Sequence, residues 1–345
     1  MKEAELTTER TLLQERLLTI IRRFPQRKVL VVGDSVADQF VFGAISRVSR
    51  EAPVFILRHE HTETTPGGAA NCAMNLASLG ASVSLISVAG EDEAGRALTE
   101  KLQSAGIECS GLIISSGLQT TTKVRILAGQ AHSTRQQVIR IDYEGQPLSD
   151  FRLRRTLLES VNKQLAAADA VIISDYNYGV MNSEIADTIR EAAKTRGIPV
   201  LVDSRFQLAA YTGFTSATPN EEEVETLLGK TLDDGELPAA GQKLREQLGH
   251  RALLVTRGRH GMTLFEPGVE PLEIEAVGAR EPVDGTGAGD TVIAAYTLAL
   301  ASDASFPDAA RLANHAGGLV VMKRGTATVS SQELEHSILQ SPLTV

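Results

Sequence analysis

The sequence predicts an α/β protein with a doubly wound, mostly parallel β-sheet, helices on both faces, and a small β-sheet lid. Short apolar, β-branched runs alternate with runs of helical length, which is the pattern of a parallel sheet with helical crossovers. Glycines follow three of the helical runs, at Gly80, Gly106 and Gly197, where they would end the helices. Two segments, 40–64 and 120–144, contain short β-rich runs without helices. We expect these two segments to form the lid.

The first expected element is an amphipathic helix over residues 5–24, where leucine, isoleucine and phenylalanine recur at helical spacing. Residues 29–33 form a continuously apolar run typical of a strand buried on both faces. We therefore divide the chain into an N-terminal helical segment, 1–28, and one large domain, 29–345, that carries the lid. Further strands are expected at residues 83–89, 170–175, 199–203 and 252–256, and helices at residues 69–79, 94–105, 151–168, 182–196, 221–228, 288–301, 308–323 and 331–339.

The chain has 345 residues and a formal net charge of −9. A negative balance argues against general affinity for nucleic acid or anionic membranes, both of which favour basic surfaces. It leaves a nucleotide ligand possible, because a phosphate site needs only local backbone donors and a few cations. Cys72 and Cys109 are too few for a disulfide framework, and no segment has the roughly 18 apolar residues that span a bilayer. We expect a cytoplasmic protein.

The most specific local motif is Gly285-Thr286-Gly287-Ala288-Gly289-Asp290, which precedes an apolar, helix-forming run. Its small residues let successive N–H groups approach a ligand, and the positive end of the following helix points at the same place. Such an anion hole beside a carboxylate suits phosphoryl transfer to an alcohol, with Asp290 as the base. Taken alone, the motif also fits an ordinary turn with Asp290 as a helix cap.

Other segments add candidate ligands. Gly67-Gly68-Ala69-Ala70-Asn71 opens a helix with small residues, so a ligand could approach the backbone beside the Asn71 amide. Asp34 and Asp38 follow the first strand, at the sheet edge where ligands usually bind. Either aspartate could instead cap a helix or lie solvated in a loop. The acidic turn at residues 220–223 could simply stabilise the dipole of the helix that it begins. Residues 255–261 could simply form two strands joined by a turn.

In this order, the motifs resemble those of the ribokinase/PfkB family of carbohydrate kinases along nearly the whole chain. The early Gly-Gly motif and the late Gly-Ala-Gly-Asp motif match two signatures of that family. The resemblance implies an ATP-dependent kinase that phosphorylates a sugar or sugar phosphate, with a ribokinase-like fold. It also implies that Asp290 is the catalytic base, and that Gly287, Ala288 and Gly289 form the anion hole.

The resemblance also implies roles for matching positions. It places Asp38, Gly67, Gly68 and Asn71 at the sugar, with Asp34 and Arg125 as further substrate-binding candidates. It connects Asn220 and Glu223 with Mg²⁺ and phosphate. The nucleotide would be lined by Thr256, Gly258, Gly261 and Asn314. Asp284 and Thr286 match positions near a site for a monovalent cation such as K⁺.

Within the family, the chain looks like the heptose-7-phosphate kinases at residues 46–54, 122–125, 174–176, 261–264 and 325–330. Those enzymes phosphorylate the anomeric hydroxyl of D-glycero-D-manno-heptose 7-phosphate. Some are fused to a nucleotidyltransferase domain, and because this chain ends at Val345 we expect stand-alone kinase activity. Arg47, Arg50, Lys123 and Arg125 are candidates to bind the substrate phosphate.

Three positions depart from that closer pattern. Tyr178 stands where a lysine is expected, Ser204 replaces a proline, and Gly285 replaces a valine before the anion hole. Two alternatives therefore stay open: a PfkB kinase for fructose, ribose or a nucleoside, and a non-catalytic homologue that binds a sugar or nucleotide. We expect the lid to close over the sugar, which would exclude water. We also expect a homodimer formed through the lid sheet, because uncovered sheets invite partners.

Overall fold

The computed structural model describes residues 2–129, 135–145, 148–233, 235–278 and 282–340. Its centre is a six-stranded sheet with the order β10-β9-β8-β1-β4-β5, in which neighbouring strands are parallel. The strands are β1 (Lys28–Gly33), β4 (Ser82–Gly90), β5 (Glu108–Ser115), β8 (Ala170–Asp175), β9 (Val200–Ser204) and β10 (Ser216–Ala217). The predicted doubly wound sheet is confirmed.

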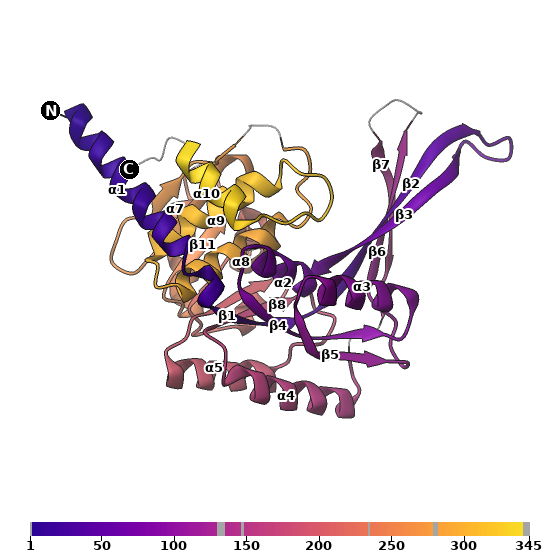
Figure 1. Cartoon of the computed structure of the whole chain (residues 1–345), viewed down its shortest axis with the longest axis horizontal. Helices are drawn as coiled ribbons and strands as arrows, with labels where there is room; N and C mark the ends of the chain where they lie inside the picture. Colours follow the sequence, from indigo (N-terminus) through magenta and orange to yellow (C-terminus); the bar gives the residue numbers. More distant parts are fainter. Residues whose placement is uncertain (1, 130–134, 146–147, 234, 279–281, 341–345) are drawn as a thin grey trace.

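Helices cover both faces of this sheet, as the continuously apolar strands require. In β1, Val29 and Val31 pack into one hydrophobic core, whereas Leu30 and Val32 pack into another on the opposite face. The first core is covered by α1 (Lys2–Ile21), α2 (Ala69–Ser78), α3 (Glu93–Ser104), α8 (Ala288–Ala301), α9 (Phe306–Val320) and α10 (Ser331–Gln340). The second is covered by α4 (Phe151–Leu165), α5 (Ser183–Arg196), α6 (Glu221–Leu228) and α7 (Leu237–Leu248). Figure 1 shows α4 and α5 on the opposite side of the sheet from α2 and α3.

A second sheet projects from one side of the central domain (Figure 1). It has the order β3-β2-β6-β7 and consists of β2 (Ser35–Val48), β3 (Phe55–Gly68), β6 (Thr122–Gly129) and β7 (Gln136–Tyr143). We call it the outer sheet. It contains the β-rich segments expected to form the lid. A single residue, Asp34, separates β1 from β2, and α2 begins directly after β3. Both ends of this hairpin are therefore attached to the central domain.

A third, small sheet is antiparallel and has the order β11-β12-β13. Its strands are β11 (Leu253–Thr256), β12 (Met262–Phe265) and β13 (Leu272–Ile274). β11 and β12 are joined through the short 3₁₀ helix η3 (Gly258–His260), so the strand–turn–strand expected at residues 255–261 is confirmed. Two further 3₁₀ helices, η1 (Phe24–Gln26) and η2 (Leu208–Ala210), join other elements.

β5, β10, β13 and α7 were not predicted from the sequence, and β5 and α7 differ in the reason. β5 is interrupted by Gly111, where an ideal Cβ would lie 2.7 Å from Ile86 Cγ1 and 2.9 Å from Leu85 O. The close approach coincides with a register shift between β4 and β5, and the glycine shortens the apolar run of this edge strand to Leu112-Ile113-Ile114. α7 does carry apolar residues at helical spacing, including the buried Leu237, Leu244 and Leu248, and it has proline in its first turn. The signal for α7 was therefore present in the sequence.

Candidate active site

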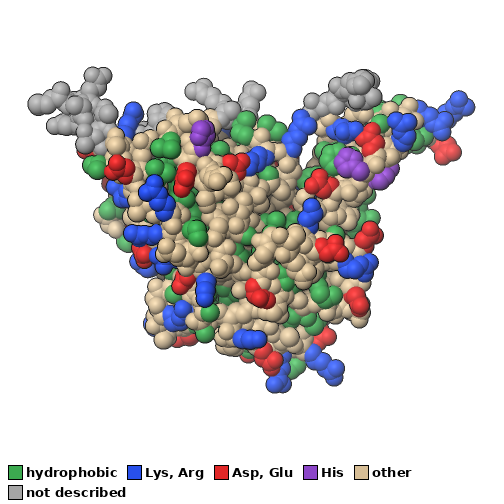
Figure 2. Space-filling model, viewed as in Figure 1, with side chains coloured by type: hydrophobic (Ala, Val, Ile, Leu, Met, Phe, Trp, Pro, Cys, Tyr) green, Lys and Arg blue, Asp and Glu red, His purple; other side chains and the backbone are tan. Residues whose placement is uncertain are grey.

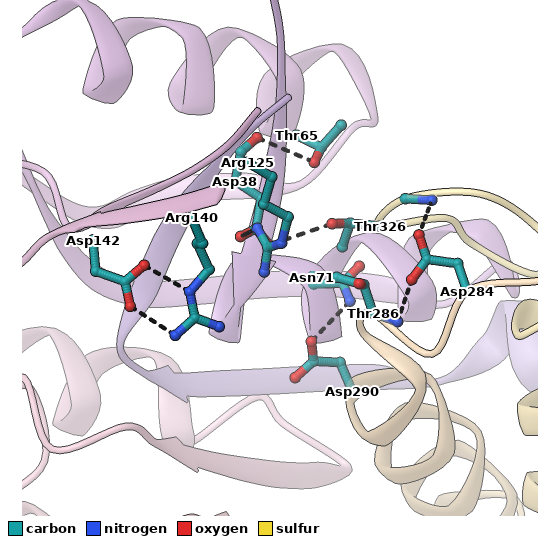
Figure 3. Close-up of polar contacts among 11 residues, drawn as sticks. Asp38, Thr65, Asn71, Arg125, Arg140, Asp142, Asp284, Thr286, Asp290 and Thr326 are labelled. Carbon is teal, nitrogen blue, oxygen red and sulfur yellow. Dashed lines mark hydrogen bonds and ion pairs between the residues drawn. The ribbon is translucent and has the colours of Figure 1, made fainter. Parts of the chain in front are cut away.

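The N-terminal turns of α2 and α8 meet beside the carboxyl ends of the central strands, where ligands bind in open α/β sheets. Asp290, in the first turn of α8, is 4% exposed. Its Oδ2 accepts a hydrogen bond of 2.8 Å from the Asn71 side chain, and its Oδ1 accepts one of 3.0 Å from the Tyr176 hydroxyl. The Cys72 thiol lies 3.5 Å from Oδ1. The two glycine motifs, distant in sequence, thus come together at one carboxylate (Figure 3).

Burial raises the pKa of Asp290 to about 6, although these three donors oppose the shift. The carboxylate is therefore ionised at neutral pH and can be protonated within the range in which enzymes operate. A base with such a pKa can accept the proton of an alcohol that is losing it to phosphoryl transfer.

Asn71 is itself fixed by a buried chain of side chains. The Asn75 amide donates to Asn71 Oδ1 at 3.1 Å and to the Asn71 carbonyl at 3.0 Å. The Thr291 hydroxyl, one residue after Asp290, donates to Asn75 Oδ1 at 3.0 Å. The amide of Asn71 is thereby oriented to donate to Asp290 rather than to accept.

The anion-hole loop needs glycine at one position for a clear reason. Gly287 has φ +75°, and an ideal Cβ there would lie 2.5 Å from Asn71 Nδ2. In contrast, a Cβ at Gly285 or Gly289 would meet nothing within 4 Å. Ala288 and Gly289 begin α8, so their backbone lies at the positive end of the helix. The loop therefore has open space beside it where an anion could approach.

Asp284 closes the other end of this loop. Its carboxylate accepts backbone hydrogen bonds of 2.9 Å from Thr286 and from Gly325 (Figure 3). These hydrogen bonds hold the pKa of Asp284 below its usual value. The predicted monovalent-cation residues, Asp284 and Thr286, are thus brought together, and the carboxylate ties the anion-hole loop to the 324–326 segment.

Asp38 lies in β2 of the outer sheet and is 5% exposed. It forms an ion pair with Arg125 of the neighbouring strand β6, and Thr326 donates to its Oδ2 at 3.3 Å. A Cβ at Gly67 would lie 2.5 Å from the same oxygen, so glycine is required for the carboxylate to occupy this position. The structure therefore gathers three of the predicted substrate residues at one point.

Asp34 has a different environment. It is 1% exposed, and its carboxylate accepts backbone hydrogen bonds from Tyr176, Tyr178 and Val180, at 2.9, 3.0 and 3.1 Å. Burial nevertheless raises its pKa to about 6. Asp34 thus holds the loop that follows β8. This structural function was not predicted, and the substrate-binding assignment of Asp34 stays a prediction.

Tyr176 was missed as a site residue, and Lys123, which was predicted as a phosphate ligand, lies beside it. Tyr176 directly follows β8 and donates to the base, and the Lys123 ammonium of β6 lies 5.8 Å from the centroid of its ring and 5.9 Å from that of Tyr178. Burial lowers the pKa of Lys123. Tyr176 belongs to the sequence motif at residues 174–176, but only the tertiary structure shows that its hydroxyl reaches α8.

Of the three residues that depart from the heptose-7-phosphate kinase pattern, Tyr178 and Ser204 form side-chain hydrogen bonds. The Tyr178 hydroxyl donates to Glu144 at 2.5 Å, so this residue joins the loop after β8 to the end of the outer sheet. The Ser204 hydroxyl donates to Asp175 at 3.1 Å. Gly285 has open space around its Cα. None of the three therefore blocks the carboxylate of Asp290.

The predicted nucleotide residues lie on the small sheet and its neighbours. Asn220 and Glu223 form a reciprocal capping box at the start of α6, with hydrogen bonds of 2.9 and 2.8 Å. Thr256 pairs with Asn220 in an isolated β-bridge. Gly258 has φ +53° in η3, and Gly261 has φ +83°, where a Cβ would lie 2.0 Å from Ile274 O. Asn314, 4% exposed, donates to the Glu275 carbonyl at 2.7 Å.

Two cavities are lined by predicted substrate residues. One of about 620 Å³ lies between the outer sheet and the 283–286 and 324–326 segments, and its lining includes Arg125, Arg135 and Arg324. The other, of about 400 Å³, is lined in part by Asp34 and Tyr178. Arg47 and Arg50 instead lie exposed near the far end of the outer sheet, where charged side chains and histidines gather on the surface (Figure 2).

The comparisons with known proteins agree with this arrangement. The family model of the pfkB family carbohydrate kinases matches residues 26–333. The chain belongs to this family. The predicted family and the predicted enzyme class, a carbohydrate kinase, are thus confirmed, and the ribokinase-like fold is confirmed by solved structures.

Among curated relatives, the chain is 43% identical over 317 residues to the bifunctional protein HldE of Pseudomonas aeruginosa, which covers 92% of this chain and 64% of that protein. It is 42% identical, with the same coverage, to the bifunctional protein HldE of Ectopseudomonas mendocina. The chain therefore spans less than two thirds of the length of these relatives.

Two solved pfkB-type structures show the shared fold. Arabidopsis thaliana ribokinase, complexed with ribose and ATP, has a TM-score of 0.70 at 22% identity and covers 91% of this chain and 99% of its own. Escherichia coli phosphofructokinase-2, in complex with substrates and products, has a TM-score of 0.75 at 20% identity, and the match covers 91% of this chain and 98% of that chain.

Within the described part of this pfkB protein, no helix has the length and apolar character needed to cross a membrane.

Proposed function

We propose that this pfkB protein transfers the γ-phosphoryl group of ATP to a sugar phosphate, and that its acceptor is the anomeric hydroxyl of a heptose 7-phosphate. The observation that carries the kinase activity is the Asp290 carboxylate, held by Asn71 beside the N-terminus of α8. The acceptor is supported by the motifs that resemble the heptose-7-phosphate kinases, such as residues 46–54 and 325–330, and by the similarity to the HldE proteins.

The residues of this site fit the reaction. The acceptor hydroxyl oxygen forms a bond to the γ-phosphorus while the bond from that phosphorus to the β–γ bridging oxygen breaks, releasing ADP. Asp290 takes the hydroxyl proton. The backbone of Gly287, Ala288 and Gly289, at the positive end of α8, stabilises the charge on the transferring group.

Cationic side chains near Asp38 support an anionic acceptor. The cavity of about 620 Å³ has Arg125, Arg135 and Arg324 in its lining, and guanidinium groups suit phosphate recognition. Arg125 also contacts Asp38, the predicted sugar ligand. Of the phosphate candidates proposed from the sequence, Arg125 and Lys123 lie beside the site, so we favour them over Arg47 and Arg50.

We also propose Mg²⁺ and, through Asp284 and Thr286, K⁺ as cofactors. Among the residues that the structure describes, no three His, Cys, Asp or Glu side chains are grouped to hold a metal ion. Mg²⁺ usually keeps several waters and binds one or two carboxylates together with substrate phosphates. Glu223 would contribute such a carboxylate, and bound Mg²⁺ would neutralise phosphate charge.

An ATP-dependent kinase of this kind would act in the cytoplasm, with residues 29–345 as its kinase domain.

The outer sheet supports both a lid and a dimer interface. Large apolar side chains are exposed on it, namely Val48, Val54, Phe55, Val138, Ile139, Ile141 and Tyr143. We propose that two copies pair through this sheet, burying these residues. Phe55→Asp should then yield monomers in sedimentation velocity experiments. Phe151→Asp, at an exposed phenylalanine of α4, should leave the dimer intact. A monomeric parent, or a dimeric Phe55→Asp, would exclude this interface.

The acceptor is tested by ADP release with a panel of heptose 7-phosphate, fructose, ribose and a nucleoside. We expect the heptose phosphate to give the highest kcat/KM and Asp290→Asn to lower kcat at least about 100-fold. Preference for another sugar would refute the acceptor but keep the kinase. Full activity in Asp290→Asn would refute the base, and ATP binding without turnover on any acceptor would favour a non-catalytic homologue.

A further inference from the structure

We propose that Tyr176 is a positioning residue for the base: its hydroxyl fixes one oxygen of the Asp290 carboxylate, and Lys123 of the outer sheet covers its ring. The proposal rests on the proposed function in one respect, namely that Asp290 is the base. It adds a residue of the loop after β8 and a residue of the outer sheet to the group that orients the proton acceptor.

The hydrogen bonds to the carboxylate are divided between its two oxygens. Asn71, from α2, donates to Oδ2 at 2.8 Å, and Tyr176 donates to Oδ1 at 3.0 Å. Donors on both oxygens prevent the carboxylate from rotating about its Cβ–Cγ bond. Without the Tyr176 hydroxyl, the donor left to Oδ1 among the described residues would be the thiol of Cys72 at 3.5 Å, and thiols are weak donors.

Tyr176 is itself held from several directions. Its backbone N–H donates to Asp34 at 2.9 Å. An ideal Cβ at Gly68 would lie 3.3 Å from Tyr176 Cε2, so the ring packs directly against the glycine backbone of the sugar-binding motif. The Lys123 ammonium lies 5.8 Å from the ring centroid, within the range of a cation–π interaction. Three separate segments therefore fix the position of the phenol.

The carboxylates near Asp290 oppose its ionisation, whereas the neighbouring donors favour it. Asp38 of the outer sheet raises the pKa of Asp290, and Asp203 at the end of β9 and Asp290 mutually disfavour each other's charge. Cys72 and Tyr176 have pKa values raised well above their usual range, so both stay protonated donors at neutral pH. Since a donor favours the ionised carboxylate, the Tyr176 hydroxyl both orients the base and helps to keep it charged.

The placement of Lys123 connects this base to the outer sheet. Lys123 lies in β6, paired with Asp38 of β2 and with Asp142 of β7. A shift of the outer sheet would move the cation away from Tyr176. The base is therefore held in its hydrogen-bonded position while the outer sheet lies as observed.

The test measures the Asp290 carboxyl directly. The full chain is labelled with [¹³Cγ]aspartate, and the Asp290 signal is assigned by comparison with Asp290→Asn. We expect its titration midpoint, about 6 in the parent, to rise by about one pH unit in Tyr176→Phe, the change typical of losing a hydrogen bond to a charged group. Tyr178→Phe is the matched control, because it lies in the same loop and beside Lys123 but donates to Glu144. Its midpoint should equal that of the parent.

Kinetics give a second readout. In Tyr176→Phe, the acidic limb of kcat should move to higher pH and kcat should fall about tenfold, with the KM for ATP unchanged. Equal midpoints in Tyr176→Phe and the parent would overturn the proposal. If Tyr176→Phe does not fold, site-specific 3-fluorotyrosine at position 176 preserves the ring and strengthens the donor, so the midpoint must fall. An unchanged midpoint would again overturn it. The titration needs no sugar, so failure of the acceptor panel would not affect this result.

Discussion

The side-chain amide of Asn71 lies 2.8 Å from the carboxylate of Asp290, although 219 positions separate them in the chain. Asn71 belongs to the first turn of α2 and Asp290 to the first turn of α8. This contact joins the early and late glycine motifs into one site. A change at Asn71 should therefore act on the base as well as on the sugar.

Replacing Asn71 by aspartate should impair the base strongly. Two carboxylates at hydrogen-bond distance share a proton, so the pKa of the pair is split and one group stays protonated at neutral pH. We expect kcat at pH 7 to fall about 100-fold or more, and the activity to recover in part at higher pH. Ala73→Asp is the comparison, because it adds a buried charge to the same helix at a residue outside the Asn75–Asn71–Asp290 chain of hydrogen bonds. Equal effects of both substitutions would show that charge burial alone is responsible.

The pH dependence of the reaction should follow Asp290. Its pKa is raised to about 6 by burial, and the base acts as the ionised form, so kcat should be lost as the pH falls through about 6. The limb is measured from kcat at saturating ATP and sugar between pH 5 and 9. An acidic limb near pH 4 would contradict the observed burial of the carboxylate.

The same shift predicts how Asp290→Asn changes stability. Because the folded pKa of about 6 exceeds the ordinary value of 3.8 for an aspartate, the folded chain favours the protonated acid. The stability that Asp290 contributes is fully present below about 3.8 and is lost as pH rises through about 6. Relative to the parent, Asp290→Asn should therefore gain up to about 3 kcal/mol between pH 4 and 7. Urea unfolding across this range measures it, and a pH-independent difference would contradict the shift.

The buried pair of Asp38 and Arg125 should respond differently to single and double substitution. The two side chains are only 8% and 11% exposed, so Arg125→Met leaves an uncompensated buried carboxylate and should cost about 3 kcal/mol of unfolding free energy. The double variant Asp38→Asn with Arg125→Met should recover much of that loss. It should not recover activity if Asp38 binds the sugar. A double variant as active as the parent would exclude Asp38 as a ligand.

Glu223 can be tested separately as a helix cap and as a Mg²⁺ ligand. Glu223→Gln keeps an oxygen that can accept from Asn220 N–H, so stability should change by less than about 0.5 kcal/mol. Its lost charge should raise the Mg²⁺ concentration needed for half-maximal ADP release severalfold. Glu222→Gln, in the same turn but exposed and outside the capping box, is the control. An unchanged Mg²⁺ requirement in Glu223→Gln would restrict Glu223 to capping.

The sequence predicted the central sheet well because its strands are continuously apolar and its helices end at glycines. The outer sheet could be located by its β-rich runs, but its parallel pairing between β2 and β6 could not, because nonlocal register leaves no local signal. The Asn220–Glu223 capping box could have been recognised, since an N-cap residue followed three positions later by glutamate is its signature. The Tyr176–Asp290 hydrogen bond could not, because it depends on how the loop after β8 sits against α8.

The β2–β3 hairpin is held firmly where its two strands join the central domain. Ser35 pairs with Gly68, and Ala69 N–H donates to Asp34 O at 3.0 Å, so both strands are fastened where they leave the centre. Strands of 14 residues extend roughly 45 Å at about 3.3 Å per residue. The hairpin is thus long and is attached to the central domain at one end only. Asp38, Gly67 and Gly68 lie at that attached end. A partner that binds the far end of the hairpin, such as a second copy of the chain, would therefore displace the residues that would hold the sugar.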